Sequence, residues 1–173
     1  DSRHLFRPYE GQIYKGGFYI SSRGCPGGCS YCVNSTLRTI SKGCGAYFRY
    51  QKPQTTVKHL EELKTKYGAN WLKFGDDTFL LQPTQNISEL HEKIKPLNIL
   101  FGCSVRPDTV TREKVSLARD MGCVAMSVGI ESGNEEIRKN ILNRKISNRD
   151  MEDAFRIINE HDIRISSFNM IGL

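Results

Sequence analysis

Short apolar runs alternate with helical patterns along most of this 173-residue chain. The runs are rich in aromatic and β-branched residues, which favour strands. Between them, apolar residues recur at steps of three and four, which indicates amphipathic helices. Strands and helices that alternate in this way form right-handed βαβ units and a parallel sheet. The sequence therefore predicts an α/β fold with about five parallel strands, at residues 17–22, 71–74, 99–101, 124–130 and 163–171.

Five helical segments are expected beside these strands, and each follows a residue that is favoured at a helix N-terminus. These residues are Thr56, Thr84, Thr111, Asn134 and Ser147. Gly68 is expected to end the first helix, because glycine readily adopts the left-handed conformation found after a helix. Ser147 and Asp150 have the spacing of a capping box, so the last helix is expected to begin there.

The chain is too short for a complete eight-stranded α/β barrel, which needs about 250 residues. An open or partial barrel and a doubly wound sheet are the remaining alternatives. In both folds, ligands bind at the carboxyl ends of the strands. Small and charged residues follow four of the expected strands, at residues 23–25, 75–78, 102–106 and 131–133. We therefore expect the functional site at that edge of the sheet.

Half of the six cysteines lie within eight residues, as Cys25-x3-Cys29-x2-Cys32. Pro26 and the two glycines after it forbid a regular helix, so the loop can wrap around a metal centre. A four-iron cluster normally takes four cysteines. Three cysteines would leave one iron open to another ligand, as a catalytic zinc site leaves one position open.

Two other interpretations of these cysteines stay open, and both use Cys44 as a fourth ligand. One is a structural zinc site, and the other is a closed four-cysteine cluster that transfers electrons without catalysis. Cys103 and Cys123 lie near expected strands, and we expect them to be buried thiols.

The net charge of the chain is +6, and five basic residues gather between residues 138 and 149. We interpret Arg138, Lys139, Arg144, Lys145 and Arg149 as a solvated helical face, with an anionic substrate or RNA as the alternative. No apolar run approaches the roughly 18 residues of a membrane span, and no signal peptide opens the chain. A cysteine cluster in such a chain favours a reducing compartment, so we expect a cytoplasmic protein.

The cysteine motif, with Tyr31 before its last cysteine, resembles the cluster-binding motif of the radical S-adenosylmethionine (radical SAM) superfamily. Gly75-Asp76-Asp77 stands where that family carries a Gly-Gly-Glu-like motif for the methionine amino group, and departs from it in sequence. Glu131 is similar to a fourth-strand residue that contacts the ribose or methionyl part. Residues 168–172 resemble the start of the family's fifth-strand adenine-side motif, so the resemblance extends over nearly the whole chain.

This resemblance implies that Cys25, Cys29 and Cys32 hold a 4Fe-4S cluster whose open iron binds S-adenosyl-L-methionine. One-electron reduction then yields methionine and a 5′-deoxyadenosyl radical, which abstracts a hydrogen atom from a substrate. A reductant such as flavodoxin or ferredoxin is implied as a partner. These residues do not distinguish methyl transfer, ring formation, oxidation and sulfur insertion, and they do not identify the substrate.

Six further residues are candidates for the S-adenosylmethionine site: Tyr31, Gly75, Asp76, Asp77, Arg106 and Glu131. The resemblance implies that the aspartates accept hydrogen bonds from the ammonium group and that Glu131 pairs with ribose hydroxyls. The fork of Arg106 suits a carboxylate, and Tyr31 would pack beside the adenine or the cluster. Each role has a structural alternative: turn capping for the aspartates, a helix N-terminal charge for Glu131, a salt bridge for Arg106 and core packing for Tyr31.

The family core is a six-stranded partial barrel, so the resemblance implies that the closing strand is missing from this chain. We assign residues 1–16 to a lead-in segment and residues 17–173 to an incomplete radical SAM core domain. The chain begins with Asp1 and stops directly after a strand-like run, so we expect it to be a piece of a larger protein. Its motifs are most similar to the branch that often carries an upstream cobalamin-binding domain, which leaves cobalamin open as a further cofactor.

Overall fold

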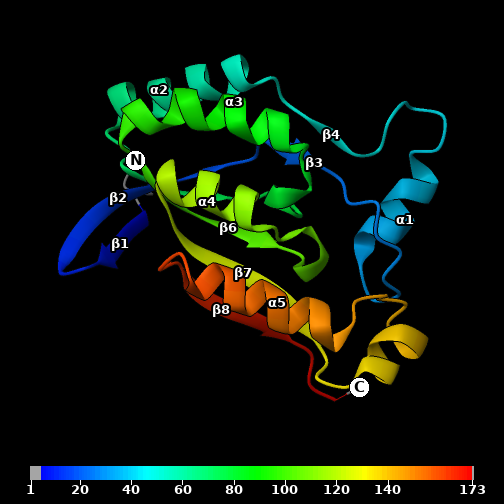
Figure 1. Cartoon of the computed structure of the whole chain (residues 1–173). Coiled ribbons are helices and arrows are strands. Elements are labelled where there is room, and N and C mark those ends of the chain that lie inside the picture. Colours follow the sequence, from blue (N-terminus) through cyan, green and yellow to red (C-terminus); the bar gives the residue numbers. More distant parts are fainter. Residues whose placement is uncertain (1–4, 173) are drawn as a thin grey trace.

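A six-stranded, mostly parallel sheet forms the centre of the computed structural model, which describes residues 5–172 (Figure 1). The strands run in the order β1, β2, β5, β6, β7, β8, and every neighbouring pair is parallel except the β1–β2 hairpin. Their bounds are Leu5–Tyr9, Gln12–Tyr19, Trp71–Phe74, Leu100–Val105, Cys123–Glu131 and Arg164–Asn169. The sheet curls into a half-barrel, so the expectation of an α/β partial barrel with five parallel strands is confirmed.

Four helices pack side by side in chain order along one face of this sheet (Figure 1). They are α2 (Pro53–Tyr67), α3 (Thr84–Ile94), α4 (Arg112–Asp120) and α5 (Asn148–Asn159). A short pair of strands, β3 (Ser22–Arg23) and β4 (Arg49–Tyr50), flanks helix α1 (Val33–Ile40) and its following loop at one side of the molecule (Figure 1). None of the helices in the described part of the chain combines the length and the apolar character needed to cross a bilayer.

The helix ends confirm some capping expectations and correct others. Thr111 accepts a hydrogen bond from the Lys114 amide, and Ser147 forms the expected capping box with Asp150. The expectation for Thr56 is wrong, because α2 already begins at Pro53 and buries Thr56 inside the helix. Proline suits the first position of a helix, because the backbone N–H that it lacks would have no hydrogen-bond partner within the helix at that position.

Three other segments differ from the sequence-based boundaries. The helix expected after Asn134 is present but short: it starts at Glu135 and continues as a π-helical turn, Ile137–Ile141. Asn134 caps it as expected, because its side chain accepts from the Glu136 amide at 2.9 Å. The strand expected at Gly17 begins at Gln12, because its first residues pair with β1 in a hairpin that precedes the parallel strands. Helix α1 directly follows the cysteine motif and has no counterpart among the expected helices.

The core lies between the sheet and α2–α5, and an aromatic group fills its centre. The rings of Phe74, Phe79 and Phe101 pack with centroid separations of 4.9, 5.0 and 5.7 Å, and all three side chains are fully buried. Such pairs contribute about 0.5–1.5 kcal/mol each beyond the burial of their area. Cys103 and Cys123 are also fully buried, as expected. This core holds the carboxyl ends of β5 and β6 in place.

The interpretation of the basic cluster as a solvated face is wrong for two of its five members. Arg138 is fully inaccessible, and its guanidinium donates to the Ile146 carbonyl at 3.1 Å and the Ser132 carbonyl at 2.7 Å. Arg144 is only 5% exposed. The backbone carbonyls that turn towards these guanidinium groups satisfy them inside the protein, which sequence periodicity does not reveal. Lys139, Lys145 and Arg149 are exposed, as expected.

Candidate functional site

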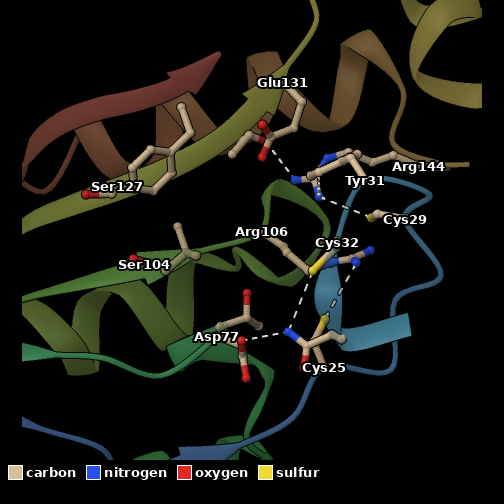
Figure 2. Close-up of a pocket in the computed structure, with 15 residues that line it drawn as sticks. Cys25, Cys29, Tyr31, Cys32, Asp77, Ser104, Arg106, Ser127, Glu131 and Arg144 are labelled. Atoms are coloured by element: carbon tan, nitrogen blue, oxygen red, sulfur yellow. Dashed lines mark hydrogen bonds between the residues drawn. The ribbon is translucent and has the colours of Figure 1, made fainter. Parts of the chain in front are cut away.

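A pocket lies at the carboxyl ends of the parallel strands, where the sequence predicts a functional site. It is lined by Asp77 and Thr78 after β5, Ser104 and Arg106 at the end of β6, Ser127, Gly129 and Glu131 of β7, and Phe168 of β8. The cysteine loop closes its other side with Cys25, Cys29, Tyr31 and Cys32. Figure 2 shows the three cysteines opposite the strands that carry Ser104 and Ser127. One loop therefore presents three sulfurs to a cavity built from four strand ends.

The shape of the cysteine loop depends on two close approaches. Gly24 has φ +84°, and a Cβ there would lie 2.4 Å from the Tyr47 carbonyl oxygen, so only glycine fits. A Cβ on Gly27 would lie 2.4 Å from Nη1 of Arg106. Asp77 fixes the start of the loop by accepting from the Gly24 amide at 3.0 Å. The loop is thus drawn tightly against the ends of β5 and β6.

Residues far along the chain hold the other end of the loop. The Ser30 amide donates to the Leu142 carbonyl at 3.0 Å, and the Ser30 hydroxyl donates to the Ile141 carbonyl at 2.8 Å. The Asn143 side chain donates to the Gly28 carbonyl at 2.8 Å. These bonds join the cysteine loop to the segment between β7 and α5.

Each of the three sulfurs receives at least one N–H donor. The Gly27 amide at 3.4 Å and Arg106 Nη1 at 3.9 Å face Cys25 Sγ. Arg144 Nη1 faces Cys29 Sγ at 3.8 Å, and Asn34 Nδ2 faces Cys32 Sγ at 3.7 Å. Outer hydrogen bonds of this kind orient the side chains that bind a metal centre. Each of the three candidate ligands therefore has an N–H group in place beside its sulfur.

Arg144 brings a buried positive charge to the cysteines. Its Nη2 donates to the Gly129 carbonyl at 2.7 Å, and its Nη1 also lies 3.4 Å from the Tyr31 hydroxyl (Figure 2). Its Nε is buried and has no hydrogen-bond partner among the described residues. It makes no ion pair with any carboxylate in the described chain. The Glu131 carboxylate is nearby, because Glu131 Oε1 and Arg144 Nη2 lie 2.9 and 3.0 Å from the same point beside Gly129. The unpaired Nε of Arg144 is a buried donor that a ligand in the pocket would satisfy.

Tyr31 lines the pocket, with its hydroxyl beside Arg144. Burial raises the pKa of Tyr31, and the charge of Arg144 opposes that rise only in part. The phenol is therefore neutral at physiological pH and serves as a hydrogen-bond donor or acceptor, not as a base.

Arg106 lines the pocket but already has a carboxylate partner. Its Nε and Nη2 donate to the two carboxylate oxygens of Asp108 at 3.0 and 2.7 Å, and this pair raises the pKa of Arg106. The salt bridge that the sequence left as an alternative is thus present. Only Nη1 remains directed at the pocket, towards Cys25.

The two neighbouring aspartates after β5 lie in different environments. Asp76 is 3% exposed, does not line the pocket, and accepts from the Ser21 hydroxyl at 2.8 Å and the Ser22 hydroxyl at 2.5 Å. Burial raises its pKa, although these hydrogen bonds act in the opposite direction. Asp77 lines the pocket and accepts from Asn34 Nδ2 at 2.7 Å as well as from Gly24. In this arrangement both carboxylates anchor the chain around the cysteine loop.

Gly75 also lies away from the pocket wall. A Cβ there would lie 2.0 Å from Cζ of Phe18, so the glycine allows the Phe18 ring to pack across the end of β5. Glu131, in contrast, lines the pocket at the end of β7. It has φ +68° next to a register shift in the β7–β8 pairing. A left-handed glutamate stores local strain, a property that concentrates at functional sites.

Comparison with known proteins now identifies the family. A family model described as the radical SAM superfamily matches residues 19–173. The chain belongs to the radical SAM superfamily.

Curated relatives cover most of this chain but are much longer. Bacteriochlorophyllide d C-12(1)-methyltransferase of Chlorobaculum tepidum is 27% identical over 158 residues, which are 88% of this chain and 33% of that protein. Anaerobic magnesium-protoporphyrin IX monomethyl ester cyclase of Cereibacter sphaeroides is 24% identical over 88% of this chain and 24% of its own length. This radical SAM domain thus spans about a third of the first of these relatives.

Solved structures of the same fold include the radical S-adenosylmethionine methyltransferase TsrM from Kitasatospora setae, with cobalamin and a [4Fe-4S] cluster bound. It superposes with a TM-score of 0.76 at 18% identity over 92% of this chain and 32% of that chain. Escherichia coli coproporphyrinogen III oxidase, HemN, superposes with a TM-score of 0.62 at 15% identity, over 92% and 38%. At these identities the match establishes the half-barrel fold.

The residues of this radical SAM domain fit a 4Fe-4S cluster better than a single metal ion. Within residues 5–172, no three Cys, His, Asp or Glu side chains gather closely enough to hold one ion. A structural zinc would need four ligands at about 2.0–2.3 Å. A 4Fe-4S cluster instead takes one thiolate per iron. It is therefore suited by three separate sulfurs that surround one cavity and that each have an N–H donor. Cys44 is exposed and lines a different cavity, away from the other three cysteines.

Sequence reasoning placed four of the six candidate cofactor residues on the pocket wall and missed others. Tyr31, Asp77, Arg106 and Glu131 line the pocket, whereas Gly75 and Asp76 do not. The missed residues that line it include Asn34, Ser104, Ser127 and Arg144. The position of Asn34 two residues after Cys32 was a usable signal. Arg144 gave none, because it sits within a run of exposed basic residues.

Proposed function

We propose that this radical SAM domain binds a 4Fe-4S cluster and S-adenosylmethionine and cleaves the latter reductively. The observation that carries the proposal is the convergence of Cys25, Cys29 and Cys32 on one cavity, with an N–H donor at each sulfur. When bound, the cluster and its sulfonium ligand supply one-electron cleavage of a carbon–sulfur bond. In this proposal residues 17–173 form the catalytic core and residues 1–16 lead into it.

The chain's own residues have several separate tasks. The three cysteines hold the cluster, and Asp76 and Gly75 shape the end of β5 behind the cysteine loop. Glu131 accepts hydrogen bonds from ribose hydroxyls, because its carboxylate lines the pocket and has no ion-pair partner among residues 5–172.

The remaining candidates act on the charged end of the ligand, on the cluster and on the adenine. Asp77 accepts from its ammonium group with the carboxylate capacity that Gly24 and Asn34 leave free. Arg106 and Arg144 supply positive charge near its carboxylate and the thiolates. Tyr31 packs beside the cluster, and Phe168 offers an exposed ring to the adenine.

Anaerobic reconstitution with iron and sulfide tests this proposal. We expect a reducible cluster and release of 5′-deoxyadenosine from S-adenosylmethionine, because three thiolates leave one iron open. Cys29→Ala is expected to abolish both, as measured by iron content, electron paramagnetic resonance and chromatography of the products.

Cys44→Ala is the matched control, since Cys44 is an exposed cysteine in a separate cavity. We expect it to retain the cluster and the activity. If Cys44→Ala loses iron as completely as Cys29→Ala does, the protein is a closed four-cysteine or zinc-binding domain and the proposal is wrong.

We propose cobalamin-dependent methyl transfer as a second form of this activity in the complete protein. A methyltransferase is among the curated relatives, and the TsrM structure contains cobalamin. The protein encoded by the whole gene, purified anaerobically with hydroxocobalamin, is expected to show the visible absorption of bound corrinoid. A longer protein that takes up the cluster but no corrinoid would favour direct hydrogen abstraction instead.

The proposal includes a reductant such as flavodoxin or ferredoxin and a location in the cytoplasm, where thiols remain reduced. The cysteine cluster, with all six cysteines unpaired, supports that compartment.

A further inference from the structure

Helix α1 turns its apolar side towards solvent. Val33, Leu37 and Ile40 share one face of the helix, because they are four and three residues apart, and they are 63%, 44% and 73% exposed. Asn34, the buried residue of α1, bonds to Cys32 and Asp77, whereas every residue from Thr36 to Ile40 is exposed. A surface helix normally buries its apolar stripe. Helix α1 buries no apolar side chain, so its apolar stripe remains a surface that suits a partner.

The segment around this helix carries the excess positive charge of the chain. Residues 11–60 contain no Asp or Glu, and the net charge of the chain is +6. Their basic residues are Lys15, Arg23, Arg38, Lys42, Arg49, Lys52 and Lys58. None of these makes an ion pair with a described carboxylate, and Lys42 and Arg49 are exposed after α1. Lys42 and Arg49 are thus unpaired, exposed cations close in sequence to the apolar stripe, and such charges complement an acidic surface.

The position of α1 relates this surface to the cysteines. Cys32 is the N-cap of α1, so the helix starts at a sulfur that lines the pocket. In Figure 1, α1 and its following loop lie at the outer side of the molecule, clear of the four helices that cover the sheet. The other side of the cysteine loop faces the strand ends, where the substrate side of the pocket lies. A protein that must approach the cysteines from outside therefore meets α1 first.

We propose that the α1 face, defined by Val33, Leu37, Ile40, Lys42 and Arg49, docks an acidic one-electron carrier protein. The inference rests on the proposed function, because it assumes that a cluster is bound by the three cysteines. In each encounter the carrier loses one electron and the cluster gains it, and no covalent bond forms or breaks. An apolar centre with a charged rim matches the anatomy of transient interfaces, and redox encounters use small ones, below about 1,200 Å².

An acidic protein fits this face better than a nucleic acid does. The centre of the face is aliphatic, whereas proteins that hold single strands present aromatic rings on which bases stack. Opposite charges also accelerate protein encounters at low ionic strength, which is an advantage for a carrier that must bind and leave repeatedly.

Stopped-flow reduction of the reconstituted protein tests the docking face. The probes are an acidic flavodoxin in its fully reduced form and, separately, dithionite as a small reductant. We expect Lys42→Glu/Arg49→Glu to lower the second-order rate constant with flavodoxin at least tenfold at low salt. Ile40→Glu is expected to have a similar effect. Reduction by dithionite is expected to be unchanged in all variants, because it needs no docking surface.

The double variant Lys66→Glu/Lys93→Glu is the matched control, since it changes the charge equally at exposed sites on α2 and α3, outside residues 11–60. An equal fall in this control, or no fall in the docking variants, would overturn the proposal. So would a dimer that Ile40→Glu dissociates, or RNA binding that is lost in Lys42→Glu/Arg49→Glu while flavodoxin reduction persists. Failure of the proposed function is distinguishable from failure of the docking proposal. In the former case dithionite itself would yield no reduced cluster or no 5′-deoxyadenosine.

Discussion

At the scale of single residues, the site depends on where a few charges are buried. Arg144 is almost inaccessible, faces the Cys29 sulfur and lacks a carboxylate partner in the described chain. Arg106 resembles it in facing a sulfur, but its charge is shared with Asp108. Arg144 is therefore the stronger source of positive potential at the cysteines.

Removing the charge of Arg144 is expected to make the cluster harder to reduce. Reduction adds negative charge, which the nearby guanidinium stabilises. A tenfold change in the equilibrium constant corresponds to 59 mV for one electron, and one charge-assisted hydrogen bond contributes about 1.5–3 kcal/mol. We therefore expect Arg144→Gln to lower the midpoint potential by on the order of 60 mV in a titration followed by electron paramagnetic resonance.

Two companion variants separate charge from structure. Arg144→Lys keeps the charge and is expected to recover most of the potential. Lys145→Gln removes the same charge from the exposed neighbour and is expected to leave the potential unchanged. Equal shifts in Lys145→Gln and Arg144→Gln would show that Arg144 has no special contact with the cluster.

At the scale of elements, the cysteine loop is a rigid turn held by its neighbours. Its entry at Gly24 lies against the Tyr47 carbonyl, and its end becomes the first turn of α1. Its conformation therefore depends on contacts with Tyr47, the end of β5 and the segment after β7, in addition to the glycine at its entry.

Gly24→Ala is expected to prevent the loop from closing and to reduce iron incorporation severely. The new Cβ would lie 2.4 Å from backbone that cannot swing away, in addition to the strain of φ +84°. Gly43→Ala is the control, because Gly43 has φ +91° but no atom within 4 Å of the added Cβ. Backbone strain costs roughly 1–3 kcal/mol at either position, so both proteins are expected to melt earlier in thermal denaturation. Only Gly24→Ala is expected to lose iron, and equal iron content in the two variants would contradict this account.

At the scale of the whole molecule, sequence pattern predicted the sheet and the edge that carries the site. The spacing of apolar residues and the capping residues predicted the positions of α4 and α5. Their caps are local hydrogen bonds between Thr111 or Ser147 and residues three positions away, so the sequence reveals them. The chain order of strands then placed the carboxyl ends together. Such patterns did not predict long-range contacts. Asp76 is buried where it accepts hydrogen bonds from Ser21 and Ser22, which lie 55 and 54 residues earlier in the chain, whereas its neighbour Asp77 is exposed.

The basic residues show the same limit. Arg138 and Arg144 have exposed lysines as sequence neighbours, yet both are buried because backbone carbonyls of other segments accept their hydrogen bonds. No periodicity marks such residues, and only the folded chain distinguishes them from Lys139 and Lys145. The exposure of the apolar stripe of α1 likewise depends on how the folded chain places this helix.

The hydrogen bonds between Ser30 and residues 141–142, and between Gly28 and Asn143, have a consequence for biosynthesis. During translation, the three cysteines emerge from the ribosome more than a hundred residues before the segment that fixes their loop. The nascent thiols are therefore without their final geometry until β7 and the turn after it have been made.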